Sequence, residues 1–249
     1  MKRTLFFLVI YALTPWIVSA QNSDDRSLQQ AGQLLIKLQQ HILATPQSFD
    51  MRYTYANEHT PAILLDSLEG KMTVAGKYYR CLIRNTETIR NDHYHIIVFH
   101  DDRLIYLSVP PAIDTAAMQP LQMLEKMMKQ QHIERCEIAR KGPQQTIRFI
   151  FPKDQLCKRM EMTVDTASWQ IKDFTSIVKT STLVDEQVTL DKSYDEYAIV
   201  KTTFSHYAAV APSAQLFDAS NFFYKSGKEY KPAAAFPDYK IFIGSPQLQ

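Results

Sequence analysis

The side chains best suited to chemistry in this sequence are histidines, cysteines and carboxylates. His93 and His95 alternate in a segment with strand-like periodicity, so they share one face, while His100 has the opposite parity. Imidazoles at this spacing could bind zinc, but no cysteine or carboxylate completes a ligand set with the spacing of a zinc site. We therefore interpret the three as solvated histidines near turns, and we predict no metal.

The 3 cysteines, Cys81, Cys136 and Cys157, are an odd number, and their spacing fits no metal site. An oxidising compartment would permit a disulfide. The expected state is buried, mostly free thiols, and a Cys136–Cys157 bridge is the alternative.

Carboxylates such as Asp50, Glu69 and Asp173 lie on separate predicted strands. A catalytic pair among them is one hypothesis, but nothing in the sequence selects a pair, and solvated strand faces explain these residues as well. The sequence has no Gly-x-Ser-x-Gly elbow, no His-Glu-x-x-His helix and no phosphate-binding glycine loop, and it holds only 6 glycines. We therefore predict that the protein is not an enzyme and needs no cofactor.

The N-terminus has the pattern of a secretory signal peptide. Lys2 and Arg3 form a positive start, 5–17 is apolar, and Val18-Ser19-Ala20 places small residues before the expected cut. The apolar stretch is short for a bilayer-spanning helix, and polar residues follow at once, so an uncleaved anchor is the weaker alternative. We predict a signal peptide at 1–20, cleavage after Ala20 and a periplasmic mature chain without a lipid anchor.

The composition fits one globular domain. Of the 249 residues, 21–249 are enough to bury a sizeable core, and no later segment reads as a membrane-spanning helix. The net charge of +2 is small and the basic residues are scattered, which argues against nucleic acid as a partner. We expect a single domain over 21–249 with an aromatic C-terminal extension at about 205–249.

The pattern of apolar residues predicts a mainly β protein. A helix is predicted at 28–42, where apolar residues recur at three- and four-residue steps. After it the period changes to two, which is typical of half-buried strands, and polar turns between them favour an antiparallel meander. A second helix is predicted at 115–132. The predicted strands cover 49–55, 68–74, 78–84, 86–90, 94–99, 104–109, 133–140, 146–151, 159–164, 169–178 and one or two segments within 188–204.

This order of elements resembles that of the outer-membrane lipoprotein carrier family, the LolA-like proteins, over about residues 27–179. An amphipathic helix leads into 48–53, and 68–74 is similar to the family's glycine-containing second strand. The segment 91–97 resembles its turn before an aromatic strand, with His93 in place of glycine. The pair 159–165 and 169–174 resembles its late hairpin. No arginine follows the second strand, where the family carries one that holds its lid closed, and the C-terminal part is longer and more aromatic.

The resemblance implies a LolA-like half-open antiparallel β-barrel with an N-terminal helix and a central helical lid over an apolar cavity. It implies a periplasmic carrier or chaperone for lipid or lipoprotein acyl chains, monomeric, with membrane-associated donor and acceptor partners. An ordinary packed core is the alternative explanation of the same apolar residues. The implied cavity lining consists of Phe49, Met51, Tyr53, Met72, Val74, Ile97, Phe99, Met160, Met162 and Phe174 on the strands, and Met123, Met127 and Met128 on the lid.

A second function fits the same resemblance. LolA-like domains also occur in envelope-stress regulators that bind proteins, so a sensor or protein-interaction scaffold is the alternative to a carrier. The aromatic C-terminal extension favours this alternative, because aromatic surfaces are enriched where proteins bind one another.

Overall fold

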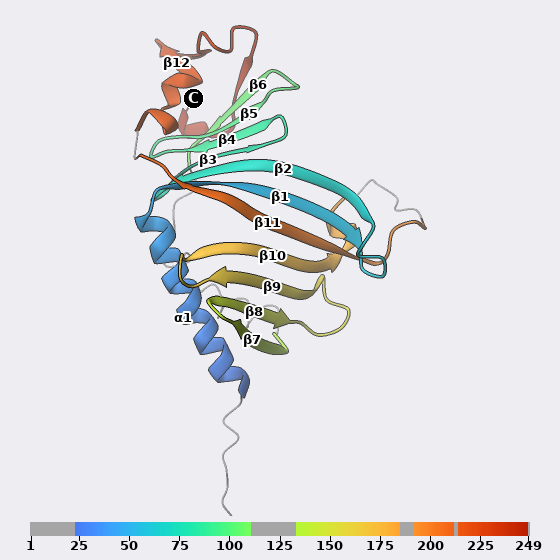
Figure 1. Cartoon of the computed structure of the whole chain (residues 1–249). Coiled ribbons are helices and arrows are strands. Elements are labelled where there is room, and N and C mark those ends of the chain that lie inside the picture. Colours follow the sequence, from blue (N-terminus) through green and yellow to red (C-terminus); the bar gives the residue numbers. More distant parts are fainter. Residues whose placement is uncertain (1–22, 111–132, 185–191, 212–213, 249) are drawn as a thin grey trace, which may run out of the picture.

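The computed structural model describes residues 23–110, 133–184, 192–211 and 214–248 (Figure 1). The predicted signal peptide at 1–20 lies outside the described residues. So does the predicted lid segment at 115–132, with Met123, Met127 and Met128. Within the described part of the chain, one α-helix accompanies a large sheet, and the prediction of a mainly β protein is confirmed.

Helix α1 (Ser23–Ala44) begins the described chain. Its apolar stripe is buried at Ala31 and Leu38, as the three- and four-residue spacing predicts, and Leu34 is buried beside them. The helix ends where the Thr45 N–H donates to the His41 carbonyl at 2.9 Å, just before Pro46 starts the path into the first strand.

Twelve strands form one sheet in the order β14-β6-β5-β4-β3-β2-β1-β11-β10-β9-β8-β7. Neighbouring strands are antiparallel except β14 and β6, which are parallel. Two meanders therefore meet at the centre, where β11 joins β1 to β10. The strands are β1 (Gln47–Asn57), β2 (Leu64–Ala75), β3 (Tyr78–Ile83), β4 (Thr86–Arg90), β5 (His95–Phe99), β6 (Leu104–Ser108), β7 (Arg135–Lys141), β8 (Gln144–Ile150), β9 (Cys157–Asp165), β10 (Gln170–Lys179), β11 (Tyr197–Ala209) and β14 (Lys240–Ile243).

The sheet is long, curved and open (Figure 1). Its first and last strands, β14 and β7, have no hydrogen-bonded contact with one another, so the sheet does not close into a barrel. This agrees with the half-open barrel that the sequence predicts, while the lid of that prediction lies outside the described residues.

Helix α1 packs against one face of the sheet, here called the inner face, over β7 to β10. The last turn of the helix also reaches β1 and β2, while its main core contacts are with β7 to β9. The core between helix and sheet holds Ala31, Leu34, Cys136, Ile147, Phe149, Phe151 and Cys157. Among the described residues the three cysteines form no disulfide; Cys136 and Cys157 are buried and Cys81 is half-buried. Burial raises the pKa of the Cys157 thiol.

The opposite, outer face of β4 to β6 is covered by the C-terminal segment, defined here as residues 214–248. It contains the hairpin of β12 (Phe223–Ser226) and β13 (Glu229–Pro232) together with the short turns η2 (Ala214–Phe217), η3 (Ala219–Asn221) and η4 (Pro246–Leu248). The Asn91 side chain donates to the Phe217 carbonyl at 2.9 Å and ties the segment to the β4–β5 turn. The buried residues of this second core are Ile89, Ile96, Val98, Ile105, Leu107, Phe217, Phe222 and Phe223.

Most aromatic residues of the C-terminal segment thus pack on the protein's own sheet, while Tyr224 and Phe242 are exposed. Phe222 stacks on Phe236 with ring centroids 5.8 Å apart, and Phe223 meets Tyr94 edge-on at 5.0 Å. The aromatic C-terminal extension, which favoured an interaction scaffold, therefore packs largely within the fold. No helix among the described residues is both long enough and apolar enough to cross a membrane.

Candidate functional site

The strand register brings the predicted cavity residues of the sheet onto the inner face. Residues directly opposite one another on neighbouring strands share a face. Phe49 lies opposite Met72, and the row continues through β3 and β4 to Ile97. A second row runs from Tyr53 through β11 to Phe174 and on to Met162. The register thus places these residues on one side of the sheet, while their role as a cavity lining stays a prediction.

These side chains form an apolar layer that is only partly covered. Met51 is buried, with 4% of its surface exposed. The others are half-buried: Phe49, Tyr53, Met72, Val74, Ile97, Phe99, Met160, Met162 and Phe174. Met160 packs against the core beneath α1, whereas Ile97 and Phe99 lie at the far end of the sheet. The layer therefore extends from the helix-covered end across the open sheet.

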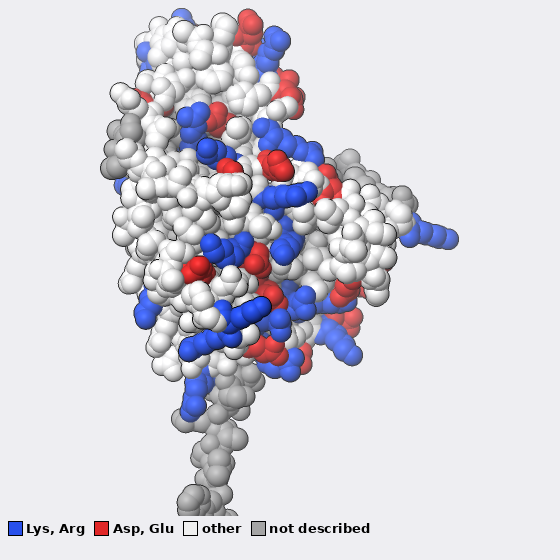
Figure 2. Space-filling view, viewed as in Figure 1, with Lys and Arg blue, Asp and Glu red and all other residues white. Residues whose placement is uncertain are grey.

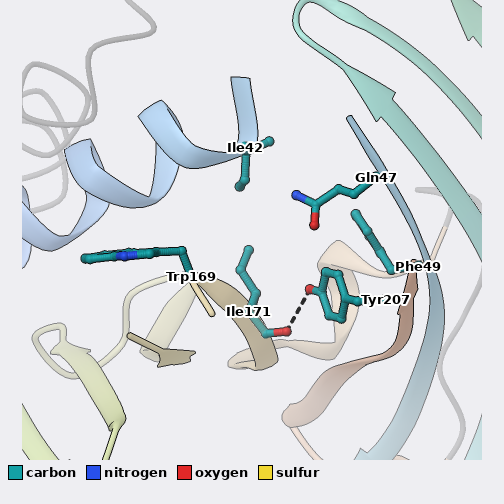
Figure 3. A pocket seen from close by; sticks show the side chains of 6 residues that line it. All are labelled: Ile42, Gln47, Phe49, Trp169, Ile171 and Tyr207. Carbon is teal, nitrogen blue, oxygen red and sulfur yellow. Dashed lines mark hydrogen bonds between the residues drawn. The ribbon is translucent and has the colours of Figure 1, made fainter. Parts of the chain in front are cut away.

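A small, partly open cavity lies where the last turn of α1 meets the starts of β1 and β10 and the end of β11 (Figure 3). Its volume is about 30 Å³, about that of one water molecule, so it does not hold an acyl chain. Six side chains line it: Ile42, Gln47, Phe49, Trp169, Ile171 and Tyr207. Only Phe49 of these was predicted as a cavity residue.

Tyr207 reaches the inner face because β11 carries a bulge. The pairing of β1 with β11 shifts by one residue near Ser48 and Asp50, and His206 adopts the left-handed region with φ 52°. Phe204 and Tyr207 therefore both contact Phe49, with ring centroids 5.8 and 5.0 Å away. The predicted strand ends near residue 204, so the sequence analysis did not identify Tyr207 as a residue of the inner face.

The Tyr207 hydroxyl donates to the Ile171 carbonyl at 2.8 Å, which links β11 to β10 (Figure 3). Burial raises the pKa of Tyr207 to about 12. The folded protein thus holds this proton more tightly than the unfolded chain, in which tyrosine has a pKa of about 10. The stabilisation is complete below the unfolded value and is lost as the pH rises through the folded value.

We expect Tyr207→Phe to lower the free energy of unfolding at neutral pH by about 1 kcal/mol, because one hydrogen bond is lost. Its urea midpoint should fall accordingly. Its free energy of unfolding should also fall less steeply than that of the wild type between pH values of about 10 and 12. Urea titrations followed by fluorescence across this range measure both effects. Tyr224→Phe, at an exposed position, is the control and should keep the wild-type pH dependence. Equal slopes in wild type and Tyr207→Phe would contradict the prediction.

The histidines do not converge. His93 lies in the exposed turn before β5. His95 lies on the inner face, with Nε2 3.3 Å from the Tyr79 hydroxyl, and burial lowers its pKa. His100 faces the C-terminal segment on the outer side, with Nδ1 3.0 Å from the Tyr239 hydroxyl. The described residues contain no group of three or more His, Cys, Asp or Glu side chains able to hold a metal ion.

The three strand carboxylates belong to the polar outer face. Asp50 lies 3.0 Å from His206, Glu69 lies opposite Arg52, and Asp173 accepts from the Thr163 hydroxyl at 3.3 Å. Figure 2 shows Lys and Arg interspersed with Asp and Glu across the strands in this view. The arrangement is that of a solvated strand face with ion pairs, and it brings no carboxylate pair into a cavity on the inner face.

No family model and no curated protein matches the sequence. Solved structures similar to the fold include an uncharacterized conserved protein from Thermus thermophilus. It is 10% identical, with a TM-score of 0.46, over 86% of this chain and 99% of that chain.

Two further similar structures bear on the resemblance seen in the sequence. One is the MucA/MucB complex of Pseudomonas aeruginosa, 12% identical with a TM-score of 0.42, over 82% of this chain and 63% of that chain. The other is a LolA superfamily protein from Nitrosomonas europaea, 6% identical with a TM-score of 0.35, over 77% of this chain and 99% of that chain. The LolA-like resemblance of the sequence thus recurs among the similar structures.

Proposed function

We propose that the protein is a non-catalytic carrier that holds an acyl chain of a lipid or lipoprotein on the inner face of its open sheet. The observation that supports this most is the apolar layer on that face, which is only half-buried although it spans both meanders. A fully packed core would leave such residues covered on all sides. In this proposal the mature chain acts in the periplasm as a monomer and exchanges its cargo with membrane-associated partners.

The binding energy would come from the chain itself. Each buried methylene contributes about 0.8 kcal/mol, so a chain of about ten methylenes would contribute on the order of 8 kcal/mol. Methionine side chains suit such a surface, because they are flexible and polarisable and adapt to ligands of varied shape. Met51 and Met72 lie on the neighbouring strands β1 and β2, and Met162 lies on the same face of β9.

The experiment combines lipid extraction with displacement of a fluorescent fatty acid. We expect mass spectrometry of the extracted protein to find acyl lipid in near-stoichiometric amount. Unlabelled fatty acids should displace the probe with an affinity that rises about fourfold for each added methylene, until the inner face is filled. Absence of co-purifying lipid together with absence of displacement would exclude the carrier function. Displacement that does not depend on chain length would show that the inner face is not the binding surface.

A further inference from the structure

A group of exposed apolar residues lies at one end of the sheet, the end at the right of Figure 1 where β1 turns into β2. We call it the loop-end patch. Its members lie in or beside the β1–β2, β8–β9 and β10–β11 connections. With their exposed fractions they are Ile63 (64%), Leu64 (49%), Leu65 (42%), Leu156 (64%), Leu183 (40%) and Tyr194 (43%).

Hydrogen bonds hold these connections together. The Asn57 side chain donates to the Ser193 carbonyl at 2.7 Å, and the Glu58 N–H donates to the Tyr197 carbonyl at 3.1 Å. The Tyr197 hydroxyl donates to the Gln155 carbonyl at 2.9 Å, and the Lys179 N–H donates to the Leu156 carbonyl at 2.8 Å. The apolar side chains are thus carried by one connected structure and not by independent loops.

Several charges around the patch are paired within the protein. Glu58 lies 2.6 Å from Lys158, Asp195 lies 2.8 Å from His59, and Glu196 lies 3.7 Å from Lys179. Asp66 pairs with Arg84 at 3.1 Å. Lys153, Asp154 and Lys192 lie in the same connections, so the described rim carries charges of both signs and little net charge. The rim therefore matches a surface of zwitterionic headgroups better than a strongly charged one.

The shape of the patch also favours a bilayer over a protein. Its apolar residues lie in or beside three separate connections, with 40–64% of their surfaces exposed. A protein partner would have to present a matching hollow for each tip, whereas a fluid bilayer accommodates several tips at once. Large exposed apolar patches mark partner or membrane contacts.

We propose that the loop-end patch docks the protein on the surface of a phospholipid bilayer by inserting these apolar tips. This inference rests on the proposed function for its purpose, because β2 runs from the patch to the inner-face residues Leu68 and Met72. Cargo could then pass between the membrane and the apolar layer with little exposure to water.

The test is flotation of the purified protein with phosphatidylcholine vesicles on a density gradient. The wild type should float, and high salt should leave the bound fraction nearly unchanged, because apolar insertion is not screened. The double variant Ile63→Ser with Leu64→Ser should lower the partition coefficient at least tenfold. The matched control is Leu43→Ser with Leu82→Ser, which removes two leucines of 47% and 42% exposure outside the patch and should float like the wild type.

Wild-type protein that stays with the soluble fraction would overturn the proposal, and so would a patch variant that floats as well as its control. Loss of flotation in high salt would assign binding to charges instead of the patch. Fatty-acid displacement measured on the same patch variant should remain at the wild-type level. Flotation without any displacement would reject the carrier function and leave the docking surface standing.

Discussion

Replacing Phe222 with alanine is expected to lower the free energy of unfolding by about 3–5 kcal/mol. Phe222 is 2% exposed, stacks on Phe236, and lies in the core that joins the C-terminal segment to the outer face of β4 to β6. The Arg80 guanidinium also lies 5.8 Å from the centre of its ring. Removing the ring leaves a cavity between layers that cannot easily collapse, because the strand side is fixed by its hydrogen bonds.

Urea unfolding measured by circular dichroism gives the size of this effect. The control is Tyr224→Ala, two residues away on β12, where the side chain is 53% exposed and the change should stay within about 0.5 kcal/mol. Since domains of this kind are stable by about 5–15 kcal/mol, the Phe222 variant should lose a large share of its stability. Similar unfolding midpoints for the two variants would show that the C-terminal segment contributes little to the fold.

Replacing Met72 with glutamate is expected to weaken fatty-acid binding at least tenfold. Met72 lies on the inner face, opposite Phe49 on β1 and Cys81 on β3, and is half-buried. A carboxylate at this position would have to lose its hydration when an acyl chain covers it, which costs far more than the lost methionine contact. Because Met72 is not fully buried, the folded state should persist, and circular dichroism verifies this.

The matched control is Thr73→Glu, which places the same charge on the next residue of the same strand. Thr73 faces the outer side, beside Arg80 across the β2–β3 ladder, and its variant should bind fatty acid like the wild type. Displacement titrations of both variants provide the comparison. Equal affinities for the two would show that the inner face does not hold the chain.

The sequence predicts most strands and the face that each residue takes, because alternation of apolar and polar residues is a local property of the chain. Phe49, Met51 and Tyr53 share the inner face for this reason. The partner of β1 could not be predicted, since pairing with β11 depends on the whole topology. Tyr207 and Trp169 were not predicted as cavity residues, because a bulge and a turn, not a periodic pattern, place them at the small cavity.

The burial of the outer face of β5 and β6 is also indicated by the sequence, in two runs that do not alternate between apolar and polar residues. Ile96, Ile97, Val98 and Phe99 are all apolar, and so are the residues of 104–107. Such continuous runs indicate strands that are buried on both faces. In the structure Ile96 and Val98 are fully buried beneath the C-terminal segment, while Ile97 and Phe99 face the other side.

The central position of β11 has a consequence for biogenesis. Met51 pairs with Phe204, so the two meanders cannot be joined until nearly the whole chain has been delivered, and β14 completes one edge later still. Pairings this distant along the chain slow folding. If the chain is exported as proposed, N-terminus first, its two meanders could not join during transit. For the same interval its apolar strands would be exposed, and holding chaperones on the far side would be needed to prevent aggregation.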